Sequence, residues 1–187
     1  MEKLYAYADE TGQDTLGGFF LVAVVVVGSE RDELLRWLAE VEKETGKGAL
    51  PWHKSRHEPR SAYMDRLLGD PKLRGAVFYS VYPGTRAYRD LTLLTIAKAL
   101  GERTGKRDYK VTVVIDGLRR GETRQVAVGL RRIRVPVRKV RGGREESNAL
   151  LRLADAMAGF IRDAEEGVAE WRERLDRAKA GGTIRQI

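Results

Sequence analysis

The stretch FFLVAVVVV, residues 19–27, is the longest apolar run in the chain, and five of its nine residues are valines. Its length and its content of β-branched residues predict a β-strand that is buried on both faces. A second apolar segment, residues 4–8, precedes it, and glycines at 12, 17 and 18 supply turn residues between the two. We therefore expect a β-hairpin near the start of the chain.

Outward from this hairpin, the apolar pattern alternates between the periods of helices and strands. Helices are expected near residues 31–44, 63–68, 87–103, 122–131, 147–162 and 168–178, and further strands near 76–82, 110–116 and 134–140. Ser29 and Ser147 are candidate N-caps, and Pro136 favours an edge position for the last strand. The order predicts an α/β fold: one mixed five-stranded sheet, its first three strands antiparallel, flanked by helices.

Length and composition limit the class of protein. We assign residues 1–187 to a single domain, with residues 163–187 as a C-terminal extension that carries an amphipathic helix. The content of 42% hydrophobic and 33% charged residues is typical of a globular protein. The absence of cysteine excludes disulfides, thiolate metal sites and thiol nucleophiles. No apolar run approaches the roughly 18 residues that span a bilayer, and no signal peptide is visible, so we expect a cytoplasmic protein without membrane association.

The positive charge of the chain is concentrated in one segment. The formal net charge is +8, and residues 119–144 hold ten Lys and Arg residues against Glu122 alone, which accounts for the whole excess. Such a segment attracts phosphate polyanions, and Arg131, Arg134 and Arg138 are our candidates for contacting nucleic acid. Strand alternation would place Val137 and Lys139 on one side and Arg134 and Arg138 on the other. The alternatives are a solvated charged surface and a heat-adapted, arginine-rich composition.

Three carboxylates stand where an apolar residue is expected. Asp9 and Asp116 each end an apolar strand, and the ends of strands in α/β sheets are where sites form. Asp155 is the only polar residue in LADAMAGFI, residues 153–161, a helix that is apolar nearly all round and therefore predicted to be buried. A buried carboxylate requires a metal or an ion pair. An ion pair between Asp155 and an arginine of the basic segment is the alternative to a metal site.

If the three carboxylates meet, they predict a metal centre. Carboxylates within a few ångströms repel one another unless a hard cation such as Mg²⁺ or Mn²⁺ binds them. Two such ions, roughly 4 Å apart, can hold an attacking water and the leaving oxygen of a phosphodiester. The sequence therefore indicates a two-metal nuclease site with the basic segment nearby to hold nucleic acid.

At these residues the chain resembles the domain-of-unknown-function 3800 family. YADETG at 7–12 is similar to the Asp-Glu-Ser-Gly opening of that family, and VID at 114–116 is similar to its central strand ending in Asp. Ser147 followed by LRLADAMAG at 151–159 is similar to its Ser and Leu-Gln-x-Ala-Asp-x-x-Ala-Gly helix. The resemblance implies a ribonuclease H-like fold and a nuclease role, with Asp9, Asp116 and Asp155 as ligands of two Mg²⁺ or Mn²⁺ ions.

The chain also departs from that family. Thr11 replaces the usual Ser and Arg152 the usual Gln, and PWHK at 51–54 stands where relatives carry a Glu-x-Lys or His-x-x-Lys segment. Lys54, with His53, is therefore our candidate for a transition-state or substrate contact. The fourth ligand of ribonuclease H sites has no clear counterpart, which leaves Glu10 or a glutamate of the 31–44 helix.

Other functions are compatible with parts of the pattern. His53 and His57 have the i,i+4 spacing of a helical zinc pair, but Pro51 and Pro59 disfavour a helix there. A non-catalytic module that binds nucleic acid or a protein partner on the same fold is the main alternative to a nuclease. The apolar stripe between Val168 and Ala178 offers a homodimer face unless it packs on the sheet.

Overall fold

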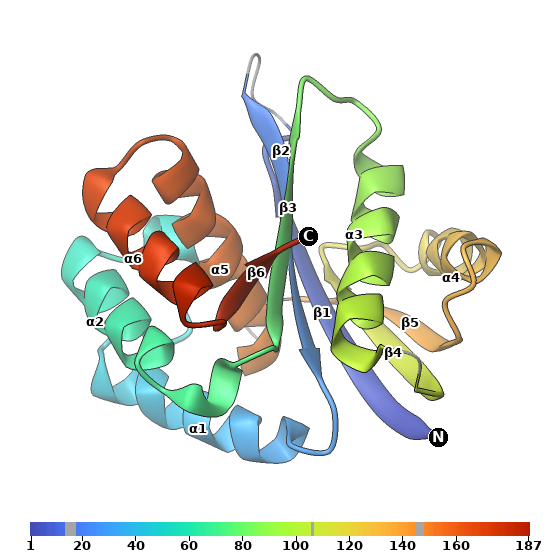
Figure 1. The fold of residues 1–187 in the computed structure, drawn as a ribbon, viewed down its shortest axis with the longest axis horizontal. Helices are drawn as coiled ribbons and strands as arrows, with labels where there is room; N and C mark the ends of the chain where they lie inside the picture. Colours follow the sequence, from blue (N-terminus) through green and yellow to red (C-terminus); the bar gives the residue numbers. More distant parts are fainter. Residues whose placement is uncertain (14–17, 106, 145–147) are drawn as a thin grey trace.

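The chain folds around a six-stranded sheet, seen edge-on in Figure 1. The computed structural model describes residues 1–13, 18–105, 107–144 and 148–187. The strands are β1 (Glu2–Thr11), β2 (Phe19–Val27), β3 (Val77–Pro83), β4 (Tyr109–Asp116), β5 (Val137–Gly143) and β6 (Ile184–Gln186). The helices are α1 (Arg31–Glu44), α2 (His57–Leu68), α3 (Tyr88–Thr104), α4 (Thr123–Arg132), α5 (Ala149–Glu165) and α6 (Ala169–Ala180), with short 3₁₀ turns at Trp52–Lys54 and Pro71–Leu73.

The sheet is mixed, in the order β5-β4-β1-β2-β3-β6. Strands β1, β2 and β3 pair antiparallel in succession, as predicted. Strands β4 and β5 continue the sheet parallel to β1, and β6 pairs parallel with β3. The predicted α/β class is confirmed, whereas the predicted number of five strands is wrong. The additional strand β6 has only three residues, too few to show a period in the sequence.

Helices cover both faces of the sheet. In Figure 1, α1, α2, α5 and α6 lie on one side, and α3 and α4 lie on the other. Strand β2 alternates between the two resulting cores: Leu21 and Val25 pack toward α5, and Val22 and Val26 pack toward α3. The prediction that residues 19–27 are buried on both faces is therefore confirmed.

Some boundaries differ from the predicted ones for local reasons. Helix α1 has the predicted bounds, but its N-cap is Glu30 rather than Ser29. Helix α2 begins at His57, before the predicted start, because Pro59 falls in its first turn, where the missing N–H has no helical acceptor to lose. The N-cap of α5 is Asn148, whose side chain accepts hydrogen bonds from two amides of the first turn at 3.0 and 3.3 Å. The predicted cap Ser147 lies outside the described residues.

Strand β5 lies at a sheet edge, as predicted, but it covers residues 137–143 instead of 134–140. Arg134 has φ of 63° and turns the chain before the strand begins. A bulge then places one extra residue in β5 relative to β4, because Val137 pairs with Val111 while Lys139 pairs with Thr112. Consequently Val137 and Val140 both face the α4 core, and the predicted grouping of Val137 with Lys139 is wrong.

The C-terminal segment is integrated into the fold. Trp171, Leu175 and Ala178 of α6 are buried in the core beside α5, and Ile184 of β6 joins the same core. The apolar stripe proposed as a homodimer face is therefore covered by the chain itself, and of that stripe Val168 remains exposed. Within the described ranges, no helix has the length and apolar character needed to cross a membrane.

Candidate functional site

Asp9 and Asp116 lie side by side at the carboxyl ends of β1 and β4. Ala8 pairs with Ile115 in parallel register, so the next residue of each strand, Asp9 and Asp116, occupies neighbouring positions. Adjacent strands are separated by about 4.8 Å. Ala8 and Ile115 face the α3 and α4 core, and alternation therefore turns both aspartates toward the face that α5 covers. The Oδ1 atom of Asp9 accepts a hydrogen bond from the amide of Glu10 at 2.9 Å.

Asp155 approaches this pair from α5, which packs across β1 and β2. Its Oδ2 atom accepts a hydrogen bond from the backbone N–H of Trp52 at 2.7 Å. Burial raises the pKa of Asp155, the Trp52 N–H and the positive charges of Lys47 and His53 oppose that rise, and the negative charge of Asp116 adds to it. The structure therefore brings Asp155 within electrostatic reach of Asp116, which itself neighbours Asp9.

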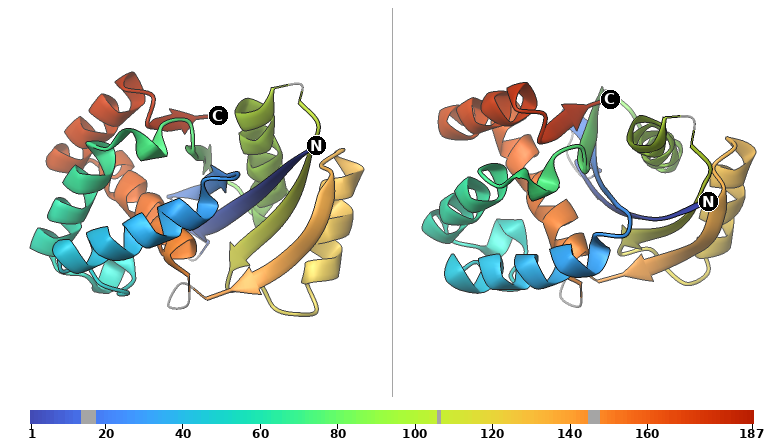
Figure 2. Two further views of the ribbon diagram at one scale, coloured as in Figure 1. Left: turned by 90° about the horizontal axis from the view of Figure 1, so that it is seen from below. Right: turned by 60° about the horizontal axis from the view of Figure 1, so that its bottom comes forward.

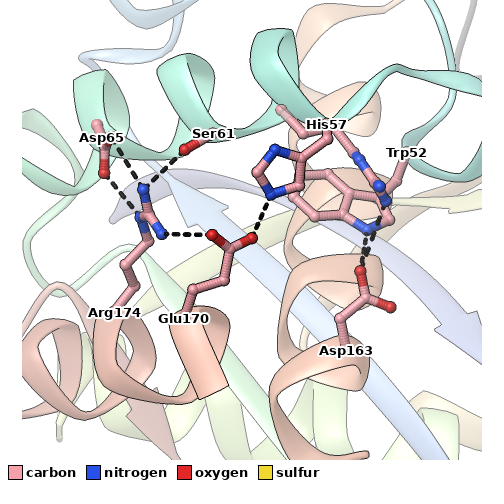
Figure 3. Close-up of polar contacts among 8 residues, drawn as sticks. Trp52, His57, Ser61, Asp65, Asp163, Glu170 and Arg174 are labelled. Carbon is pink, nitrogen blue, oxygen red and sulfur yellow. Dashed lines mark hydrogen bonds and ion pairs between the residues drawn. The ribbon is translucent and has the colours of Figure 1, made fainter. Parts of the chain in front are cut away.

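Trp52 is held rigidly where it meets Asp155. Its indole N–H donates to Oδ2 of Asp163 at 2.9 Å, a contact visible in Figure 3. Its ring lies 5.4 Å from that of Trp171 and packs directly on Gly159. A Cβ atom at Gly159 would lie only 2.2 Å from Cδ1 of Trp52, so this helical glycine is required for the close approach. Gly159, the glycine of the LADAMAGFI segment, therefore leaves the space that the Trp52 ring occupies.

Side chains of α2 and α6 contact one another near this tryptophan (Figure 3). Arg174 donates to both carboxylate oxygens of Asp65, at 2.8 and 3.1 Å, and to the hydroxyl of Ser61. Glu170 contacts both Arg174 and the ring of His57. The zinc pair that the spacing of His53 and His57 would allow, and that the sequence disfavoured, is not formed, because His57 begins α2 and pairs with α6, whereas His53 belongs to the preceding 3₁₀ turn.

The sequence analysis predicted only some of the positively charged side chains near Asp155. His53 and Lys54 are exposed on the 3₁₀ turn that also presents the Trp52 amide. Lys47 was not predicted to be a site residue, yet only 1% of it is exposed. Its ammonium group donates to the carbonyl of Leu50 and lies 5.5 Å from the centre of the Tyr63 ring. Glycines flank it in the sequence, a pattern typical of an exposed turn, so no sequence signal marked its burial.

A buried ion pair anchors α5 beside the site. Arg152, one turn before Asp155, donates from Nε and Nη2 to the two carboxylate oxygens of Glu42 at 2.7 and 2.8 Å. The two side chains are 11% and 7% exposed. Glu42 belongs to the 31–44 helix that was considered as a source of a fourth ligand, and it is occupied with Arg152. In the described residues, Asp155 contacts Trp52 and lies near Lys47 and His53, and it has no arginine of the basic segment as a partner.

Glu10 lies on the opposite side of the strand end from Asp9. It accepts a hydrogen bond from the Thr92 hydroxyl of α3, and burial raises its pKa, with the charge of Glu122 adding to the rise. It lines a cleft of about 640 Å³ to which Asp116 also contributes. Asp116 thus borders both the cleft that contains Glu10 and the α5 face that contains Asp155.

The donor chemistry of the site fits a hard divalent cation. Asp9, Asp116 and Asp155 offer carboxylate oxygens from two strands and one helix, the type of donor that Mg²⁺ and Mn²⁺ prefer. In the part of the chain that the structure describes, no three His, Asp or Glu side chains are placed to hold a single ion.

The three predicted nucleic-acid contacts do not form one surface row. Arg131 lies in the last turn of α4 and donates to the carbonyl of Val137 at 3.3 Å, and Arg134 occupies the turn before β5. Arg138 lies in the bulge of β5 and lines a separate groove on the α5 side of the sheet.

Comparison with known proteins identifies the fold. No family model and no curated protein matches the chain. Among solved structures, it is similar to ribonuclease H2 from Pyrococcus horikoshii OT3, with 13% identity over 95% of this chain and 76% of that one and a TM-score of 0.56. It is also similar to a point mutant of Bst-RNase HIII, with 15% identity over 96% of this chain and a TM-score of 0.57. The chain spans about half of that second protein, 55% of its length. The chain therefore has the ribonuclease H-like fold that the sequence resemblance implied.

Proposed function

We propose that this chain is a divalent-metal-dependent nuclease that hydrolyses phosphodiester bonds of RNA or DNA. The observation that carries the proposal is the pairing of Asp9 with Asp116 at adjacent strand ends, with the half-buried Asp155 in electrostatic reach of Asp116. Like charges gathered in this way are costly without a cation to neutralise them. The ribonuclease H-like scaffold supports the proposal at the level of the fold alone.

Each residue of the proposed site has a distinct task. Asp9, Asp116 and Asp155 would hold two Mg²⁺ or Mn²⁺ ions, which when bound activate water and stabilise the charge that develops on the phosphate. The Trp52 amide donates to the Asp155 carboxylate and would hold it in a fixed orientation. Glu10 is a further ligand candidate, from the cleft side of Asp116. Lys54 and His53 are exposed beside Trp52, where they can contact a substrate phosphate or transfer a proton.

The remaining parts of the proposal concern family and partners. We infer membership of the domain-of-unknown-function 3800 family from the YADETG, VID and LRLADAMAG segments, despite the departures at Thr11 and Arg152. Nucleic acid is the proposed partner, with Arg131, Arg134 and Arg138 as phosphate contacts. A cytoplasmic location accords with such a partner.

Cleavage of labelled oligonucleotides tests the proposal. Single-stranded RNA, single-stranded DNA and an RNA–DNA hybrid would each be incubated with the protein and Mg²⁺ or Mn²⁺, with EDTA as the metal-free reference. The variant Asp116→Asn should reduce cleavage at least about a hundredfold, as expected for loss of a preorganised charge at a reacting centre. Asp176→Asn, an exposed aspartate on α6, is the matched control and should cleave like the wild type. Equal cleavage by the two variants would contradict the proposal.

The competing function is a binding module without catalysis. It is favoured by the arrangement of the described residues, in which no three acidic or histidine side chains are placed to hold an ion. Under this alternative, nucleic acid binds equally with Mn²⁺ and with EDTA, no cleavage occurs, and Mn²⁺ does not raise the melting temperature.

A further inference from the structure

A second feature of the sheet lies on the same face as the aspartates. A groove of about 560 Å³ crosses β1, β4 and β5 beside α1. Helix α5 covers β1 and β2 on this face (Figure 2). The residues that line the groove come largely from β4 and β5, so the groove lies nearer the β5 edge. Its basic side chains are Arg31, Arg138, Lys139 and Arg141, and none of the described residues that line it is acidic.

The bulge in β5 directs two of these cations into the groove. Because the bulge adds a residue between Val137 and Lys139, Lys139 pairs with Thr112, whose neighbour on β1 is Tyr5. Without the added residue, Lys139 would pair with Val113 and point into the α4 core instead. Arg141 likewise pairs with Val114, two residues further along β4. Bulges often occur beside active sites, where they redirect a side chain in this way.

The aspartates occupy the row of the sheet that follows the two rows of the groove. On the groove face, side chains form rows across the strands, first Tyr5, Thr112 and Lys139, then Tyr7, Val114 and Arg141. The next row, about 6.6 Å beyond, consists of Asp9, Asp116 and Gly143. Gly143 has no side chain, so nothing from β5 stands between Arg141 and Asp116. Adding a Cβ there would bring it within 2.7 Å of Leu151, which keeps this position small.

The cations of the groove differ in their side-chain partners. Among the described residues, Lys139 and Arg141 form no ion pair or side-chain hydrogen bond. Two tyrosines of β1 hold Arg31 in place. Its Nε donates to the Tyr7 hydroxyl at 2.8 Å, and its guanidinium lies 4.8 Å from the centre of the Tyr5 ring. It also pairs with Asp32, which is largely exposed and lies outside the groove.

We propose that Arg31, Lys139 and Arg141 form a phosphate-binding groove that guides the backbone of a nucleic-acid strand toward Asp9 and Asp116. The inference deepens the proposed function and rests on it for the identity of the strand. The rows of Lys139 and Arg141 lie about 6.6 Å apart, which is close to the distance between successive phosphates of a nucleic-acid strand. Successive phosphates can therefore contact Lys139 and Arg141. A nucleic-acid strand fits better than an acidic protein, because the cation rows end at a site suited to phosphodiester chemistry.

The test is metal-free binding of fluorescein-labelled single-stranded RNA and DNA, measured by anisotropy in EDTA over a series of KCl concentrations. Lys139→Gln combined with Arg141→Gln should weaken binding at low salt at least about tenfold and reduce the slope of log affinity against log salt by about 1.4 to 1.8. The control, Lys98→Gln with Arg177→Gln, makes the same charge change on exposed positions of α3 and α6, outside the basic segment, and should alter both quantities far less. Arg141→Lys should retain the wild-type slope.

The outcomes separate this inference from the nuclease proposal. Because EDTA removes cleavage, a groove variant that loses binding supports the groove even if no substrate is ever cleaved. Equal affinity and slope in the groove variant and the control, with both melting like the wild type, would overturn the inference. Binding of poly-glutamate with the same affinity as the oligonucleotides, and with the same loss in the groove variant, would overturn the choice of nucleic acid.

Discussion

The backbone N–H of Trp52 and the carboxylate of Asp155 are joined by a 2.7 Å hydrogen bond across 103 residues of sequence. This contact fixes the one site carboxylate that comes from a helix relative to the two that come from strands. Because the donor is a backbone amide, no substitution of Trp52 other than proline removes it directly. The contact depends instead on the position of the Trp52 ring. That position depends on Gly159, one turn after Asp155, because the ring packs on this glycine.

Replacing Gly159 with alanine should destabilise the protein by about 1–3 kcal/mol. The added Cβ would fall 2.2 Å from Cδ1 and 2.9 Å from Cβ of Trp52, and overpacking of this kind exceeds the roughly 1 kcal/mol that alanine gains in a helix. Chemical denaturation measures the change. Gly101→Ala is the matched control: this helical glycine has open space around it, so the variant should be more stable by about 0.5–1 kcal/mol. A stabilised Gly159→Ala variant would contradict the assigned role of the glycine.

The buried pair between Glu42 and Arg152 should be essential to the position of α5. Changing Glu42 to Gln removes the carboxylate that pairs with the buried guanidinium, and the expected loss of unfolding free energy is on the order of 3–5 kcal/mol. Glu173→Gln breaks an exposed pair with Arg177 and should change stability by less than about 0.5 kcal/mol. Urea unfolding of both variants tests the prediction, and losses of similar size would show that burial of the pair has no effect.

Much of the fold followed from local pattern. The valine-rich β2 strand, the antiparallel start and the apolar α5 helix are each encoded within a short segment, so periodicity predicted them. Strand β6 has too few residues for a period. The bulge in β5 depends on pairing with β4, which no pattern within residues 134–143 records.

Some residues of the candidate site could likewise be predicted from the sequence, and others could not. Asp9, Asp116 and Asp155 were identifiable because each interrupts an apolar segment. The Glu42–Arg152 pair joins residues 110 apart, and either side chain alone looks like an ordinary surface charge. Lys47 is hidden for a similar reason, because its burial results from α2 and the 50–54 segment closing over it.

Lys47 should tune the pH dependence of the site. Its positive charge lowers the pKa of Asp155 against the effect of burial. Lys47→Met removes that charge, so the pKa of Asp155 should rise further and the acidic limb of the cleavage profile should move to higher pH. Lys43→Met, at an exposed position of α1, should leave the profile in place. The pH–rate profiles of the two variants decide the matter, since a purely structural Lys47 would reduce the rate without shifting the limb.

Asp155→Asn separates a metal ligand from a structural residue. The folded protein raises the pKa of Asp155 above its ordinary value of 3.8, so it binds the proton more tightly than the unfolded chain does. The resulting stabilisation is complete below the ordinary pKa and is lost as pH rises through the folded pKa. At neutral pH the ionised carboxylate therefore destabilises the metal-free protein, and Asp155→Asn should melt at the same temperature as the wild type or higher. Asn can still accept the Trp52 hydrogen bond through its carbonyl oxygen.

Adding Mn²⁺ should reverse this order. An ion that binds the folded state alone raises the melting temperature of the wild type. The variant lacks a ligand and should show little or no rise. Melts of both proteins at neutral and acidic pH, with Mn²⁺ and with EDTA, give the full comparison, and the metal-free difference should vanish at acidic pH as the wild-type carboxylate becomes protonated. A large loss of stability in metal-free Asp155→Asn, together with no effect of Mn²⁺ on the wild type, would make Asp155 a structural residue and remove the basis of the nuclease proposal.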